Sequence, residues 1–102
     1  MPIDFEVRRD DARGRYQAFI DGHEAQIRFA PAGERTLDFQ HTEVARELRG
    51  RGVADVLVRQ ALEDVRARGE RIIPTCPFVK AFLARHPEYQ SLVAAPGSGA
   101  GG

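Results

Sequence analysis

The 102-residue sequence has little of several features that would place it in a specialised class. It contains a single cysteine, Cys76, so no disulfide can form within the chain, and we expect a reducing, cytoplasmic setting. No apolar run approaches the roughly 20 residues of a membrane-spanning helix. The first residues lack the basic and apolar regions of a secretory signal. We therefore expect no membrane partner.

An excess of charge of either sign is also absent. Fifteen Lys and Arg residues balance fifteen Asp and Glu residues. Because a duplex is bound by a basic stripe, this balance argues against nucleic acid as a partner. The chain does contain 42% hydrophobic and 29% charged residues, as folded domains do. We expect one domain over residues 2–93, too small for a deep pocket, and a flexible Gly-rich tail over residues 94–102.

Apolar side chains alternate with others along the first half of the chain. Side chains expected to share one face recur at every second position in four short segments: Ile3, Phe5 and Val7; Tyr16, Ala18 and Ile20; Ala25, Ile27 and Phe29; and Leu37, Phe39 and His41. A period of two is typical of half-buried strands. Turn residues separate the segments, and the Asp21-Gly22 pair is a strong hairpin signal. The first half therefore predicts a four-stranded antiparallel meander.

The second half changes to a helical period. Over residues 52–68 the apolar side chains recur three and four positions apart, and Gly69 follows as a terminator. Residues 71–73 predict a short buried strand, and residues 77–85 a second helix that ends before Pro87. The element order is β-β-β-β-α-β-α, and a strand, a helix and a strand in succession favour a right-handed parallel crossover. We predict an α/β fold (α+β-like) with a mixed sheet, in which the antiparallel meander precedes a parallel crossover pair.

A glycine-containing loop before the long helix is the first candidate site. In this loop Gly50 and Gly52 let backbone amides converge, while Arg49 and Arg51 add positive charge at a helix N-terminus. Such a loop suits a pyrophosphate. It matches neither the P-loop nor the dinucleotide-binding pattern. The alternative interpretation is an ordinary loop with surface arginines.

Cys76 is the second candidate, at the junction between the short strand and the second helix. Because Pro77 follows it and proline is favoured at the first helical position, Cys76 is expected at the N-cap. Unpaired amides and the helix dipole there favour the thiolate form. His41 could act as its base, and Glu43 lies two residues further on. The alternatives are a buried structural cysteine and, for His41, a polar strand end.

The two candidate sites together resemble a known family. Residues 49–54 match the [RQ]-x-x-G-x-[GA] pyrophosphate signature of the GNAT acetyltransferase superfamily. The stretch from His41 to Ala54, with Pro74-Thr75-Cys76-Pro77-Phe78-Val79 and His86-Pro87-Glu88-Tyr89, is similar to the small CG-type GNAT family. This resemblance covers about residues 3–92. The Cys-Pro-Phe-Val and His-Pro-Glu-Tyr segments are much more specific than the superfamily signature.

The resemblance implies a small N-acetyltransferase that uses acetyl-CoA as its cosubstrate and no metal. The residues implied to bind coenzyme A are Thr42, Val44, Arg49, Gly50, Arg51, Gly52, Val53 and Ala54. Acetyl would pass to an amine, free or on a macromolecule. It would go through an acetyl-cysteine on Cys76, or directly with His41 or Glu43 as base. The alternative function is a non-catalytic CoA-binding or acetyl-CoA-binding module that modulates a protein partner. We expect a monomer or a weak homodimer.

Overall fold

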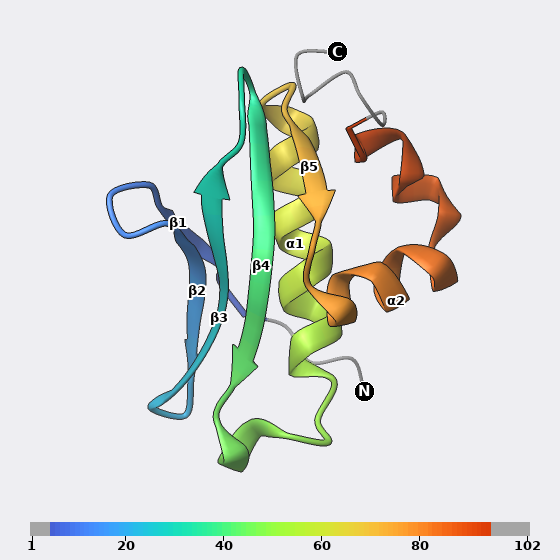
Figure 1. Ribbon diagram of the computed structural model, residues 1–102. Helices are drawn as coiled ribbons and strands as arrows, with labels where there is room; N and C mark the ends of the chain where they lie inside the picture. Colours follow the sequence, from blue (N-terminus) through green and yellow to red (C-terminus); the bar gives the residue numbers. More distant parts are fainter. Residues whose placement is uncertain (1–4, 95–102) are drawn as a thin grey trace.

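The computed structural model describes residues 5–94, and Figure 1 shows their arrangement. Five strands form one mixed sheet in the order β1-β2-β3-β4-β5. The elements are β1 (Arg8–Asp10), β2 (Arg15–Ile20), β3 (His23–Pro31), β4 (Thr36–Val44), η1 (Arg46–Leu48), α1 (Val53–Ala67), β5 (Arg71–Pro74), α2 (Pro77–Arg85) and η2 (Pro87–Leu92). The first four strands are antiparallel neighbours, and β5 pairs parallel to β4. This topology confirms the predicted fold class.

The first strand differs from the prediction. The alternation of Ile3, Phe5 and Val7 predicted a strand there, but β1 begins only at Arg8, and Ile3 lies outside the described residues. The Phe5 carbonyl accepts a hydrogen bond of 2.8 Å from the Gln60 side chain on α1. The segment is therefore held by the helix and does not extend the sheet. Phe5 and Val7 are half-buried because they pack against the edge of the core.

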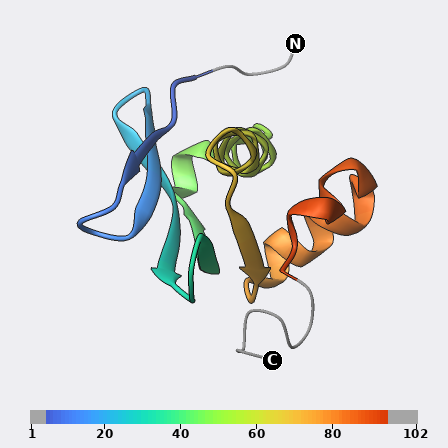
Figure 2. The same ribbon diagram turned by 90° about the horizontal axis from the view of Figure 1, so that it is seen from above.

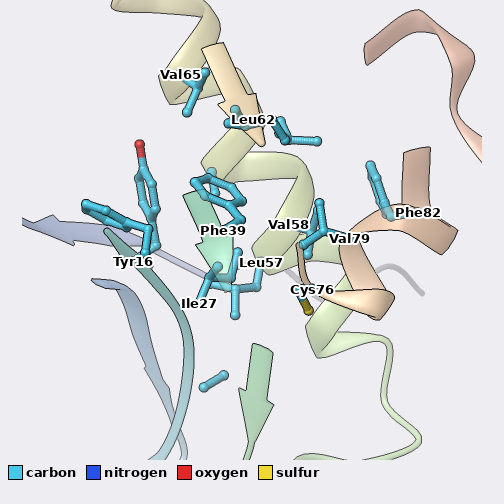
Figure 3. Close-up of a cluster of buried hydrophobic side chains, with 14 of the residues drawn as sticks. Tyr16, Ile27, Phe39, Leu57, Val58, Leu62, Val65, Cys76, Val79 and Phe82 are labelled. Atoms are coloured by element: carbon cyan, nitrogen blue, oxygen red, sulfur yellow. The ribbon is translucent and has the colours of Figure 1, made fainter. Parts of the chain in front are cut away.

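One core lies between the sheet and the helices. Figure 2, which views α1 along its axis, shows this helix on one face of the sheet, with α2 beyond β5. The apolar stripe of α1 is fully covered, and Figure 3 shows its side chains meeting those of the strands and α2. Its buried members are Val53, Leu57, Val58, Ala61, Leu62 and Val65. In the part of the chain that the structure describes, no helix has both the length and the apolarity of a membrane span.

A buried arginine fastens β1 to the end of α1. The side chain of Arg9 is only 8% exposed, and its guanidinium contacts both carboxylate oxygens of Glu70, at 2.6 and 3.1 Å. It also donates to the hydroxyl of Tyr16, which in turn donates to Asp64 on α1 at 2.7 Å. Burial raises the pKa of the Tyr16 phenol above its usual range, and the Asp64 carboxylate adds to this. The network holds the short edge strand in place.

An extra residue in β4 interrupts its pairing with β3. Arg28 of β3 lies opposite His41, but the next residue, Phe29, lies opposite Phe39. Gln40 is therefore an unmatched residue, which makes a β-bulge. The side chains of β4 change phase at this point, because facing alternates residue by residue on either side of a bulge.

The phase change corrects one grouping predicted from the sequence. Leu37 and Phe39 face the core as expected, but beyond the bulge it is Thr42 and Val44 that lie opposite the buried residues of β3. His41 was expected to share the face of Leu37 and Phe39. This was wrong, because the bulge turns it to the opposite, solvent-facing side of the sheet, where it is exposed. Glu43 lies on that same side and is also exposed.

Candidate functional site

The sheet opens between β4 and β5. The two strands pair over four positions, from Thr36 with Arg71 to Phe39 with Pro74. A last hydrogen bond of 2.8 Å joins the Cys76 amide to the Phe39 carbonyl. Beyond it, β4 continues to Val44 while the chain after β5 turns into α2, as Figure 1 shows. Within residues 5–94, no strand pairs with this last part of β4 on that edge.

The backbone amides of Thr42 and Val44 point to this open edge. The Ala45 amide donates to the Glu24 carbonyl of β3 at 3.0 Å, so the backbone polar groups of residue 45 face β3. Because the polar backbone groups alternate between the two edges of a strand, residues 44 and 42 face away from β3. The side chain of Arg49 donates to the Val44 carbonyl at 3.4 Å from the open side, as this alternation requires. An extended ligand could pair with this edge as a strand would.

A groove runs along the open edge. A hollow of about 570 Å³ is lined by Glu24, Gln26, Thr42, Glu43, Val44, Ala45, Arg49, Ala54 and Phe78. A second hollow of about 390 Å³ is lined by Val44, Leu48, Arg49, Gly50, Gly52, Val53, Ala54, Asp55, Phe78 and Arg85. The two hollows share four lining residues and are therefore one continuous groove. It leads from the edge of β4 to the glycine loop and the first turn of α1.

The glycine loop leaves the start of α1 open to a ligand. Gly50 and Gly52 have φ of 79° and 75°, a left-handed conformation that favours glycine. Gly52 is the N-cap, and among the described residues no side chain caps the helix, so the amides of the first turn have no side-chain partner there. A Cβ added at either glycine would meet no atom of residues 5–94 within 4 Å. Free amides and the positive end of the helix dipole together suit an anion.

The arginines around the groove are only in part those expected from the sequence. Arg49 lines both hollows. Arg51 lines neither and pairs instead with Asp21 in the β2–β3 turn, at 3.2 Å. Arg85 of α2, which the sequence analysis did not single out, lines the second hollow. Phe78 also lines the groove, and the spacing of seven residues places Phe78 and Arg85 on one face of α2. This spacing is the sequence signal from which Arg85 could have been predicted.

Cys76 lies at the N-cap of α2, as predicted, and Pro77 is the first helical residue. Its side chain is buried, with 3% exposure, and belongs to the core cluster that Figure 3 shows. The sulfur lies 3.4 Å from the hydroxyl oxygen of Thr42. The structure therefore brings Cys76 together with Thr42, on the core side of β4.

The other two predicted catalytic residues lie across the strand from the thiol. His41 and Glu43 project from the opposite face of β4 to Thr42. Glu43 lines the larger hollow and accepts a hydrogen bond of 2.7 Å from Gln26. The structure does not bring His41 to Cys76, because the bulge at Gln40 separates their faces. Within the described residues, no three His, Cys, Asp or Glu side chains gather as metal ligands would.

Comparison with known proteins agrees with this architecture. A family model described as GCN5-related N-acetyl-transferase matches residues 15–92. The chain is 34% identical to Protein NATD1 of Bos taurus over 88 residues, which is 84% of this chain and 78% of that protein. It is 32% identical to Protein NATD1 of Homo sapiens, with the same two coverages.

A solved structure shares the fold. The solution structure of a GCN5-like protein from Staphylococcus aureus superposes with a TM-score of 0.68 and 25% sequence identity, and the match covers 89% of each chain. Residues 15–92, which the family model matches, include all of β2 to β5, α1, α2 and the groove between them. On these grounds the chain belongs to the GCN5-related N-acetyltransferase family.

Proposed function

We propose that this protein binds acetyl-CoA in the groove beside β4 and transfers its acetyl group to an amine. The proposal rests on one observation above all. The open edge of β4, where the Thr42 and Val44 amides lack a strand partner within the described residues, leads directly to the glycine loop at α1. Coenzyme A has the matching order of groups: a long amide-containing arm follows a pyrophosphate.

Each part of the groove suits one part of that ligand. The arm is extended and has amide donors and acceptors, so it can pair with the edge of β4 in the way a strand does. The pyrophosphate suits the uncapped amides that follow Gly52 and the nearby charge of Arg49. Phe78 and Ala54 offer apolar contacts between the two ends. The reacting thioester would then lie near Thr42.

We propose direct transfer as the main route. The nitrogen of the acceptor amine attacks the acetyl carbonyl carbon, the carbon–sulfur bond of the thioester breaks, and coenzyme A leaves as a thiolate that takes up a proton. The amine loses its proton to a base. His41 and Glu43 suit this role because both lie on the exposed face of β4, which an acceptor can approach from solvent. Cys76, on the core side, could supply the proton to the leaving sulfur.

The alternative route passes through Cys76. Its thiolate would attack the acetyl group and release coenzyme A, and the amine would then attack the acetyl-cysteine. This route needs a base for the thiol, and His41 lies on the other face of the strand. The neighbour of the sulfur is Thr42, a hydroxyl that does not serve as a base. The arrangement therefore favours direct transfer.

The test is intact-protein mass spectrometry combined with turnover. The wild-type protein and Cys76→Ser are incubated with acetyl-CoA, first alone and then with a lysine-containing peptide or a polyamine. We expect acetylated amine with both proteins and no acetyl group left on the wild-type chain. A stable acetyl adduct that Cys76→Ser lacks would establish the covalent route instead. Binding of acetyl-CoA with no turnover on either amine would favour the CoA-binding module, and no binding at all would refute the proposal.

A further inference from the structure

An ion pair joins α2 to α1 across one end of the groove. Nη2 of Arg85 lies 3.1 Å from Oδ1 of Asp55, and both residues line the smaller hollow together with Gly50 and Gly52. The two side chains are 52% and 39% exposed. An ion pair this open to solvent adds little to folding stability and can exchange partners readily.

The placement of this pair is unusual for a groove that suits an anion. A lone carboxylate at this end would repel phosphate, but the guanidinium of Arg85 neutralises Asp55 in the free protein. Of the two arginines in the glycine loop, Arg51 is engaged by Asp21 and Arg49 donates its Nε to the Val44 carbonyl. Arg85 is therefore the cation that reaches the smaller hollow from the opposite wall.

We propose that Arg85 leaves Asp55 and binds a phosphate group of the acyl donor, while Asp55 holds the guanidinium at the groove in the free protein and competes with the donor for it. This inference rests on the proposed function. A guanidinium can bind two phosphate oxygens at once, and charge-assisted bonds to phosphate are strong. The guanidinium carbon also lies 6.0 Å from the centre of the buried Phe82 ring, which limits how far the side chain can swing.

Calorimetric titration with coenzyme A tests the role of Arg85. We expect Arg85→Gln to weaken binding by about tenfold or more, because a charge-assisted phosphate contact is lost. The matched control is Arg59→Gln, which removes the same charge from an exposed position on α1 one turn after Asp55, outside both hollows. It should change binding by less than about twofold. Dephospho-CoA separates the two phosphate sources: if its affinity is insensitive to Arg85→Gln, Arg85 contacts the 3′-phosphate, and otherwise the pyrophosphate.

Asp55→Asn distinguishes ligand binding from a merely structural tie. If Asp55 competes with the donor for Arg85, this variant should bind coenzyme A about twofold to fivefold more tightly. A structural tie would instead make Arg85→Gln and Asp55→Asn weaken binding alike, which would overturn the inference. So would wild-type affinity in Arg85→Gln, with the proposed function left intact. Failure of the wild-type protein itself to bind coenzyme A would refute both.

Discussion

The hydroxyl oxygen of Thr42 lies 3.4 Å from the sulfur of Cys76, at the point where β4 and β5 separate. Thr42 comes from the strand edge that faces the groove, and Cys76 is the N-cap of α2, which forms the other wall. This contact therefore joins the two sides of the opening immediately beyond the last hydrogen bond between them. It also shows that the thiol is built into the core and does not project into solvent.

The buried position of Cys76 predicts how its substitution changes stability. Cys76→Ala removes a buried sulfur, and we expect it to lower the free energy of unfolding by about 1–2 kcal/mol. Cys76→Ser should stay within about 1 kcal/mol of the wild type, because serine is a preferred N-cap and its hydroxyl can bond Thr42. Urea denaturation followed by circular dichroism measures both. Equal losses in the two variants would show that capping does not compensate there.

Substitution of Gly52 should lower both the stability of the protein and its affinity for coenzyme A. Gly52→Ala places a side chain at φ 75°, which we expect to cost about 1–2 kcal/mol, although the added Cβ meets no atom of the described chain within 4 Å. Because the strain falls on the loop that would hold the pyrophosphate, binding of coenzyme A should also weaken, by about tenfold.

The matched control is Gly22→Ala in the β2–β3 turn. Gly22 has φ 80° and equally open surroundings, so its conformational cost should be similar. It lines neither hollow of the groove, and binding of coenzyme A should be unchanged. Equal weakening in both glycine variants would mean that the loss at Gly52 reflects general destabilisation and no local contact.

Breaking the Arg9–Glu70 ion pair should greatly lower the free energy of unfolding. Arg9→Met leaves the Glu70 carboxylate without its main partner, and both side chains are largely buried. We expect a loss of about 3–5 kcal/mol. The double variant Arg9→Met with Glu70→Leu should recover part of it, because the largely buried carboxylate of Glu70 is then no longer left without its partner. A double variant less stable than Arg9→Met alone would contradict this account.

Titration of the Tyr16 phenol should lower the stability of the protein at alkaline pH. Burial and the neighbouring Asp64 raise the pKa of its phenol in the folded protein above the value of about 10 that an unfolded chain has. The folded protein thus keeps a proton that the unfolded chain releases. The resulting stability is fully present below pH of about 10 and is lost as the pH rises toward the folded-state value. Urea midpoints should stay level from pH of about 8 to 10 and fall above that, and Tyr16→Phe should flatten this dependence.

Much of the fold follows from local chemistry. Pro77 and the dipeptide His86-Pro87 predicted the bounds of α2 as observed, because proline is allowed at the start of a helix and disfavours helical geometry in the residue before it. Gly69, with φ 70°, follows the end of α1, as predicted from the preference for glycine just after a helix. The first strand could not be placed in this way, because a hydrogen bond from Gln60, far away in the sequence, takes up the Phe5 carbonyl.

The sequence predicted some features of the candidate site, and only the tertiary structure showed the others. The sequence by itself determined that a glycine loop precedes α1 and that Cys76 is the N-cap of α2, since both depend on residues adjacent in the chain. Only the tertiary structure decided that His41 faces away from Cys76 and that Arg85 replaces Arg51 at the groove. The bulge at Gln40 arises from pairing with β3, and Arg51 is drawn away by Asp21 in another turn. Such relations depend on segments that meet only when the chain has folded.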